Sequence, residues 1–256
     1  MRQLIKEDPR WKQSFDEDGF VVIRGFLDAE EVKEMKANID RYVRDIIPVL
    51  ESTEVFYEDK HRPETLKQLP RMHAHDAFFD RKVSQGKFKQ LAEWLLGEGV
   101  AAKGVQYFNK PPRMGQPTPP HQDGFYWKVT PCEGVTMWLA LEKVDKENGC
   151  LHYSRGSHRK GIREHGRTNT LGFSQGIVDF PNDDDRDGDR AVFAEAGDLL
   201  VHHAMTVHWA SGNDSLNRSR KSLGIVYHAP GVVVDTVRRD AYQKVLHQDL
   251  QEAGKI

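Results

Sequence analysis

Two side chains near the middle of the chain could hold a metal ion together. His121 and Asp123 are separated by one residue, and in an extended segment residues i and i+2 leave the same face of the backbone. An imidazole and a carboxylate on one face can occupy two adjacent positions around a metal. One more histidine would complete a two-histidine, one-carboxylate facial triad, which leaves coordination sites open and suits Fe(II). Because this spacing is common, the third ligand decides the interpretation.

A suitable third ligand lies further along the chain. His208 ends an apolar stretch and is followed by a Ser/Gly/Asn turn and then by Arg218 and Arg220. An arginine one strand beyond the metal can bind a carboxylate bidentately while the other end of that ligand chelates iron, and a 2-oxo acid would fit. The competing residues are His202 and His203. A histidine at such a position is expected to be a strand residue bonded to backbone, and His203 cannot share a strand face with His208, five residues later.

The composition excludes several classes of protein. The chain has 256 residues, of which 30% are charged and 38% hydrophobic, enough for a large core. A net charge of −2 argues against a general nucleic-acid binder. Two cysteines require no disulfide framework and indicate a reducing compartment. The N-terminus has no apolar signal core, and no run approaches the ~18 residues of a membrane span. The sequence predicts a cytoplasmic protein with no nucleic-acid or membrane partner and no obligatory protein partner.

Residues 1–98 are expected to be mixed and mostly helical. Asp28 is a good N-cap for the longest helix, whose apolar stripe continues until Pro48 and indicates core packing. Residues 60–70 are expected to form a loop or a short helix. The other elements predicted here are a helix over residues 12–20, a strand over residues 20–24, a strand over residues 55–57 and a helix over residues 88–96.

After Gly99 the pattern changes to short apolar and β-branched runs bounded by Gly, Pro, Asn and Asp. Such runs favour a β-sandwich or barrel over βαβ units. The acidic run at residues 182–189 lacks the spacing of an EF-hand, so we expect a solvated loop there. The predicted strands are residues 102–109, 135–141, 151–154, 191–193, 199–203 and 222–227.

Five sequence blocks, in this order, resemble the phytanoyl-CoA dioxygenase family of Fe(II)/2-oxoglutarate oxygenases. The blocks are Pro-Pro-His-Gln-Asp at 119–123, Trp138, residues 148–158, Gly-Asp-Leu-Leu-Val-His-His at 197–203, and His208 with Asn213, Ser215 and Arg220. Residues 72–76 and 110–115 look most like the phytanoyl-CoA dioxygenase domain-containing branch. The resemblance implies a mostly β protein with helices, in which an N-terminal helical layer packs on a double-stranded β-helix (jelly-roll, cupin-like) core. We expect a single domain over residues 1–256, helix-rich over 1–98, with the core at about 99–230 and a tail over 231–256.

The resemblance also implies roles for individual residues. His121, Asp123 and His208 become the iron ligands, which are the catalytic centre. Arg220 becomes the 2-oxoglutarate anchor; the chain has one extra residue after His208, and Arg220 is preferred to Arg218 because it opens an apolar strand. Trp138 matches a family tryptophan that lies beside the co-substrate, and Lys67 matches a lysine that reaches it.

Other residues have two readings from sequence. Gln106 either faces the pocket or not, and residues 125–127 either line the substrate entrance or pack the core. The segments 61–70 and 161–188 are expected to build the substrate wall. The remaining histidines considered are expected at the surface or as caps: His73, His75, His152, His158 and His228.

The activity implied by the resemblance is hydroxylation of a small-molecule C–H bond. Fe(II) is the metal, and 2-oxoglutarate and O₂ are co-substrates, with 2-oxoglutarate converted to succinate and CO₂. Asp123 favours hydroxylation, because related halogenases lack this ligand and leave room for a halide. Two alternatives stay open: another metal-dependent cupin-like enzyme, such as a Zn hydrolase or an isomerase, and a non-catalytic homologue that binds a 2-oxo acid.

Overall fold

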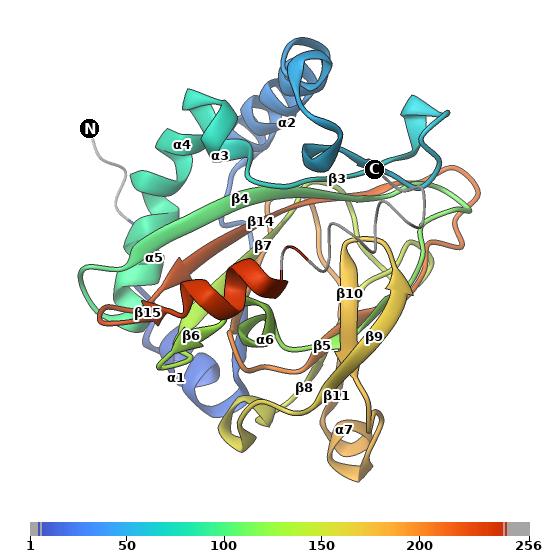
Figure 1. The fold of residues 1–256 in the computed structure, drawn as a ribbon. Coiled ribbons are helices and arrows are strands. Elements are labelled where there is room, and N and C mark those ends of the chain that lie inside the picture. Colours follow the sequence, from blue (N-terminus) through green and yellow to red (C-terminus); the bar gives the residue numbers. More distant parts are fainter. Residues whose placement is uncertain (1–4, 6, 243, 245–256) are drawn as a thin grey trace.

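Two antiparallel sheets face each other at the centre of the protein (Figure 1). The computed structural model describes residue 5, residues 7–242 and residue 244. The larger sheet has seven strands, in the order β1 (Phe20–Ile23), β12 (Leu199–His203), β7 (Gly134–Ala140), β14 (Arg220–His228), β4 (Ala101–Lys110), β3 (Leu66–Leu69) and β2 (Phe56–Tyr57). The smaller sheet has four strands, in the order β11 (Asp189–Val192), β8 (Leu151–Ser154), β13 (His208–Ala210) and β5 (Thr118–His121).

Two short strand pairs extend this sandwich. The hairpin of β9 (His165–Thr170) and β10 (Phe173–Ile177) packs with β10 against β5. The pair of β6 (Val129–Thr130) and β15 (Val233–Val234) joins the segment after β5 to the C-terminal part of the chain.

Helices cover the outer face of the larger sheet, where Figure 1 shows α2, α4 and α5 together. The α-helices are α1 (Pro9–Asp18), α2 (Ala29–Asp45), α3 (Met72–His75), α4 (Ala77–Ser84), α5 (Lys87–Leu96), α6 (Asp123–Trp127) and α7 (Asp183–Gly188). The 3₁₀ helices are η1 (Ile47–Val49), η2 (Ser52–Glu54), η3 (Pro63–Thr65) and η4 (Ser157–Lys160). Asp28 and Glu31 form a capping box at the start of α2, as the predicted N-cap requires. None of the helices in the described part of the chain has the length and apolar character of a membrane span.

Side chains alternate between the two faces of the larger sheet. In β7, Met137 and Leu139 belong to the core beneath the helices, whereas Trp138 and Ala140 belong to the core between the sheets. All seven residues of β7 are buried. A strand covered on both faces carries apolar residues on both, so β7 shows no polar alternation.

The predicted jelly-roll fold with helices is confirmed, and several details of the sequence analysis are wrong. Residues 60–70 contain β3 as well as η3, and with β1 and β2 the first 98 residues supply three strands of the larger sheet. The acidic run is the helix α7 rather than a solvated loop. Asn182 caps this helix reciprocally with Asp185, whose buried carboxylate also accepts from Arg163 at 2.8 Å.

Two of the histidines expected at the surface or as caps are in fact buried. The side chains of His158 and His228 are 8% and 5% exposed. Their burial comes from contacts with residues far away in the sequence, which no local pattern reveals. His158 faces His203, and His228 packs on Trp127.

The fold generates one stability prediction. Leu139→Ala should lower the free energy of unfolding by about 2–5 kcal/mol, because Leu139 is fully buried in β7, an interior strand, and truncation leaves a cavity. Val43→Ala is the control, since Val43 lies on α2 with 37% of its surface exposed and should cost about 0.5 kcal/mol or less. Urea denaturation of the whole chain measures both, and equal losses would contradict the assignment of this core.

Candidate active site

The two ligand histidines predicted from the sequence lie opposite each other on paired strands. His208 of β13 is the cross-strand partner of His121 of β5, and their ring centroids are 4.1 Å apart. Each ring is fixed by its Nδ1, which donates to the carbonyl of Pro119 at 2.8 Å or of Thr206 at 3.0 Å. Both Nε2 atoms are thereby left as acceptors that point into the sandwich, the arrangement that metal-binding histidines need.

Asp123 joins them from the next element of the chain. Its Oδ1 lies 3.5 Å from Nε2 of His121 and 3.8 Å from Nε2 of His208. The three ligand atoms lie within 4.8 Å of one another. Asp123 is the first residue of α6 rather than part of a strand. The expected i, i+2 geometry still holds, because Gln122 between the two ligands is extended, with φ −124° and ψ 126°.

Gln122 itself holds the ligand segment in place. Its amide nitrogen donates to the carbonyls of Gly161 and Met205 at 2.8 and 2.7 Å, and its oxygen accepts from the backbone of Arg163 at 2.7 Å. Gln122 is fully buried. The residue between the ligands therefore ties them to two other segments.

Gly124 lets α6 pack closely against Cys132 and Ala204, which lie next to β7 and β12 in the chain. A Cβ on Gly124 would lie 2.2 Å from Sγ of Cys132 and 3.3 Å from the carbonyl of Ala204, to which the backbone of Gly124 donates at 2.8 Å. A larger residue here would require Cys132 or the start of α6 to shift.

The surroundings of Asp123 and His208 keep these two groups in the forms that bind metal. Burial opposes ionisation of Asp123, but the neighbouring His208 and the hydrogen bond from His202 hold its pKa well below the usual range. Burial, together with His121 and His202, lowers the pKa of His208 well below that of a free histidine. At neutral pH the site thus offers a carboxylate and a neutral imidazole, the states that coordinate a metal.

Arg220 lies in the same cavity, which has a volume of about 220 Å³. Its guanidinium is 4% exposed and donates to Oγ of Ser222 at 3.2 Å, and its carbon lies 5.3 Å from the ring centroid of Trp138. Within the described residues, Nε of Arg220 has no hydrogen-bond partner. Burial lowers the pKa of Arg220 to about 10, so it is still charged at neutral pH. A buried cation with an unused donor is a site for an anion.

Arg218, the alternative anchor, points elsewhere. It makes ion pairs with Asp145 at 2.8 Å and with Glu147 at 2.5 Å, outside the cavity. Both pairs lie near the surface and occupy its donors. Of the two arginines, only Arg220 contributes to the cavity wall.

Two buried lysines extend the positive region of the cavity. Lys67 is paired with Glu58 at 3.1 Å. Lys110, which the sequence analysis did not consider, is the cross-strand neighbour of Arg220 and donates to the carbonyl of Gln116 at 2.5 Å. Burial and the charges of Arg220 and Lys67 lower the pKa of Lys110 well below its usual value. Arg220 stays charged and lies beside these two lysines, so this part of the cavity suits an anion such as 2-oxoglutarate.

The remaining sequence-predicted residues are now placed. Gln106, Tyr126 and Trp127 line the cavity, whereas Phe125 does not. The Phe125 ring stacks on His165 with centroids 4.1 Å apart. Of the three aromatic residues that follow the ligands, two line the cavity and Phe125 packs against His165.

Sequence reasoning missed three residues next to the ligands. His202 lies 3.2 Å from Oδ2 of Asp123, where it meets the Thr136 hydroxyl, and Tyr153 contacts His202 at 3.1 Å. His202 is a strand residue, as expected, but the expected bond to backbone is wrong, because its ring bonds two side chains. His203, on the opposite face of β12, contacts Glu133 at 3.0 Å. Period-two alternation from Leu200, which faces the inner core, could have placed His202 inside.

The residues present fit the groups that the sequence resemblance implied. The two-histidine, one-carboxylate donor set suits Fe(II) and leaves coordination positions open. The unpartnered donor of Arg220, in the same cavity, suits a distal carboxylate.

Comparison with known proteins identifies the family. The family described as "Phytanoyl-CoA dioxygenase (PhyH)" matches residues 15–222. Bovine phytanoyl-CoA dioxygenase domain-containing protein 1 is 28% identical over 255 residues, covering 84% of this chain and 87% of that protein. A probable alpha-ketoglutarate-dependent hypophosphite dioxygenase of Stutzerimonas stutzeri is 26% identical over 214 residues, covering 82% and 74%.

A solved structure shares the fold. The epimerase SnoN, in complex with Fe³⁺, alpha ketoglutarate and nogalamycin RO, matches with a TM-score of 0.71 and 24% identity, covering 88% of this chain and 85% of that one. The chain belongs to the phytanoyl-CoA dioxygenase family and is a 2-oxoglutarate-dependent dioxygenase.

Proposed function

We propose that His121, Asp123 and His208 bind the Fe(II), that Arg220 and Trp138 bind 2-oxoglutarate, and that the enzyme hydroxylates a C–H bond of a small molecule. The observation that carries this proposal is that a buried arginine, Arg220, lies in the same cavity as the metal-binding triad and bonds no carboxylate among the described residues. A carboxylate-bearing co-substrate satisfies both. Lys67 lines the same cavity, where it is paired with Glu58, and stays a candidate for a second contact to the co-substrate.

The protein supplies binding, orientation and exclusion of water. Fe(II) with 2-oxoglutarate and O₂ supplies the oxidising chemistry, which yields succinate, CO₂ and a hydroxylated product. Arg220 neutralises the distal carboxylate in a site of low dielectric, where a charge-assisted pair is strong. Trp138 gives this site a flat apolar wall, and the backbone contacts of the two histidine rings hold Nε2 toward the metal.

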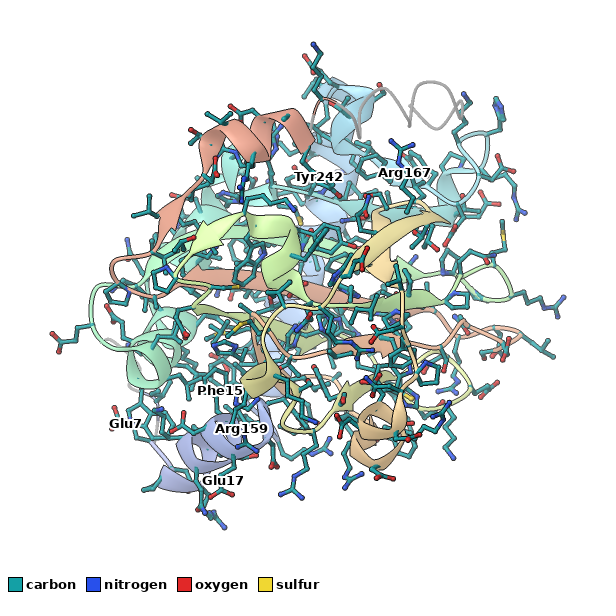
Figure 2. The ribbon with its side chains drawn as sticks, turned by 60° about the horizontal axis from the view of Figure 1, so that its bottom comes forward. Glu7, Phe15, Glu17, Arg159, Arg167 and Tyr242 are labelled. Carbon is teal, nitrogen blue, oxygen red and sulfur yellow. The ribbon has the colours of Figure 1, made fainter. Side chains whose placement is uncertain are left out.

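The hairpin of β9 and β10 forms the wall where a substrate would lie. Phe173 at its tip is 5.1 Å from the His121 ring and 6.0 Å from Phe108, both as centroid distances. The hydroxyl of Tyr126 donates to the carbonyl of Gln175 at 2.5 Å. Figure 2 labels Tyr242, from helical residues 236–242, whose hydroxyl is 2.6 Å from that of Ser174. Thr170, Gly172 and Phe173 of this hairpin line the cavity, which supports the proposal that residues 161–188 build part of the substrate wall.

Two rivals make different predictions. A zinc hydrolase or cupin isomerase on this fold would use the triad but would leave the buried Arg220 without a purpose. A non-catalytic homologue would bind 2-oxoglutarate and metal but would release no succinate.

The first prediction separates these possibilities. The whole chain reconstituted with Fe(II) should release succinate from 2-oxoglutarate in the presence of O₂, and a matching small molecule from a compound screen should stimulate the release. Succinate and consumed oxygen are both measured. Metal-dependent turnover of a compound without oxygen would rule the proposal out in favour of the hydrolase or isomerase.

The second prediction concerns the carboxylate ligand. Asp123→Ala should abolish Fe(II)-dependent succinate formation and leave the fold intact, because the side chain stands at the start of a short helix facing the cavity. Circular dichroism and the thermal midpoint provide the check on folding. Full activity in a folded Asp123→Ala protein would remove Asp123 from the metal site.

The third prediction concerns the co-substrate anchor. Arg220→Ala should raise the 2-oxoglutarate concentration needed for half-maximal turnover by on the order of tenfold or more, because a charge-assisted pair is lost. Arg218→Ala is the matched control and should leave this concentration unchanged, because Arg218 pairs with surface acids. A larger effect in Arg218→Ala than in Arg220→Ala would reverse the assignment.

A further inference from the structure

The two oxygens of Asp123 have different surroundings. Oδ1 faces the two histidines and lies 3.5 and 3.8 Å from their Nε2 atoms. Oδ2 points the other way, toward the larger sheet, where Nε2 of His202 and the hydroxyl of Thr136 both reach it. His202 and Thr136 are themselves cross-strand partners on β12 and β7. Two neighbouring strands thus present one donor each to the same oxygen.

A third side chain holds His202 from the opposite sheet. The hydroxyl of Tyr153, on β8, is 3.1 Å from Nδ1 of His202. The Tyr153 ring is fully buried and stacks on Phe20, with centroids 4.4 Å apart and planes 14° from parallel. His202 is 1% exposed. The contact therefore crosses the interior of the sandwich and leaves the imidazole little freedom to turn.

The proton positions follow from the partners. An ionised carboxylate only accepts hydrogen bonds, so Nε2 of His202 carries the proton that is shared with Oδ2. We assign the neutral tautomer, in which Nδ1 accepts from the Tyr153 hydroxyl. Each group then has a compatible partner, and the direction of donation runs from Tyr153 through His202 to Asp123.

We propose that Tyr153 and His202 are positioning residues that restrict Asp123 to binding the metal through Oδ1 alone. The proposal rests on the proposed function. A carboxylate can bind a metal through one oxygen or two, and a second oxygen would occupy a coordination position that a 2-oxo acid or O₂ requires. With Oδ2 bound to two donors, the carboxylate cannot turn to offer both oxygens without breaking buried hydrogen bonds. The chain thereby reserves three positions for the co-substrates.

The competing explanation is that these groups only satisfy one another as buried polar atoms. On that explanation their loss would lower stability without a specific effect on the metal. The positioning role predicts that metal affinity and co-substrate affinity change in a protein that is still folded. Outer-sphere partners of metal ligands commonly change metal affinity by on the order of 10- to 100-fold.

The experiment compares two substitutions at one position. His202→Leu removes one of the two donors to Oδ2 and leaves Thr136, whereas His202→Gln keeps an N–H at a similar reach. Titration calorimetry of the whole chain with Mn(II), under exclusion of oxygen, measures the dissociation constant of the metal. We expect His202→Leu to weaken Mn(II) binding by on the order of 10- to 100-fold and His202→Gln to recover most of that loss.

Two further variants make the test specific. Tyr153→Phe removes only the hydroxyl that fixes His202 and keeps the ring on Phe20, so it should weaken Mn(II) binding in the same direction by a smaller factor. His203→Leu changes the adjacent histidine on the outer face of β12, next to Phe15, and should leave the Mn(II) dissociation constant unchanged. The thermal midpoint of each metal-free variant reports on folding. If His202→Leu misfolds, Tyr153→Phe alone decides the outcome.

Binding of 2-oxoglutarate to the Mn(II)-saturated proteins gives the second readout. Release of Oδ2 toward the metal should weaken that binding in His202→Leu and not in His203→Leu. Parental affinities for both Mn(II) and 2-oxoglutarate in a folded His202→Leu and a folded Tyr153→Phe would overturn the positioning role. Failure of the parent chain to bind Mn(II) or to form succinate with Fe(II) would instead refute the proposed function, so the two failures are distinguishable.

Discussion

The site depends on the pairing of two very short strands. β5 has four residues and β13 has three, and their register places His121 directly opposite His208. A slip of one residue would turn either imidazole to the other face of the sheet, because side chains alternate with a period of two. Strands this short cannot fix their register alone. The side chain of Gln122 ties the end of β5 to Met205, in the turn before β13, and to residues 161 and 163.

A second constraint is electrostatic. Burying a guanidinium without an acid partner is unfavourable, and a buried unsatisfied donor costs roughly 1–3 kcal/mol. The cavity accepts this cost at Arg220 and adds Lys110 next to it on the neighbouring strand. Such a deficit of negative charge opposes folding in the free protein but is removed when a dianion binds. The uncompensated charge of Arg220 thus lowers the stability of the free protein but favours binding of an anionic ligand. An acidic partner for Arg220 would remove both effects.

Much of the fold and part of the site could be read from the sequence. The apolar runs of β4, β7, β12 and β14 are long and distinct, and so is the stripe of α2 after its Asp28 cap. The triplet with His121 and Asp123 was recognisable because its i, i+2 spacing survives the change from strand to helix at Asp123. β3 was missed because Lys67 and Gln68 are polar although buried, and their burial comes from cavity contacts that no local pattern records.

The roles of the neighbouring histidines could not be read from one strand. His202 and His203 were compared with His208 as though they shared a strand, but residues 204–207 turn the chain from the larger sheet into the smaller one. His202 meets Asp123 only because the two sheets face each other, and the partner of its other nitrogen, Tyr153, is 49 residues away on β8. Hydrogen bonds of this kind are properties of the closed sandwich.

Because the two sheets face each other, each can supply a different part of the site. The smaller sheet carries the two histidines, and the larger sheet carries Arg220, Trp138 and the donors that hold Oδ2 of Asp123. Asp123 stands between them on α6 and contacts the larger sheet through Thr136 and His202. Neither sheet alone presents both a metal triad and an anion site. The spacing of the two sheets therefore sets the distance between the metal site and the co-substrate anchor. Side chains that pack between the sheets, such as Tyr153 on Phe20, fix this spacing and so affect the chemistry.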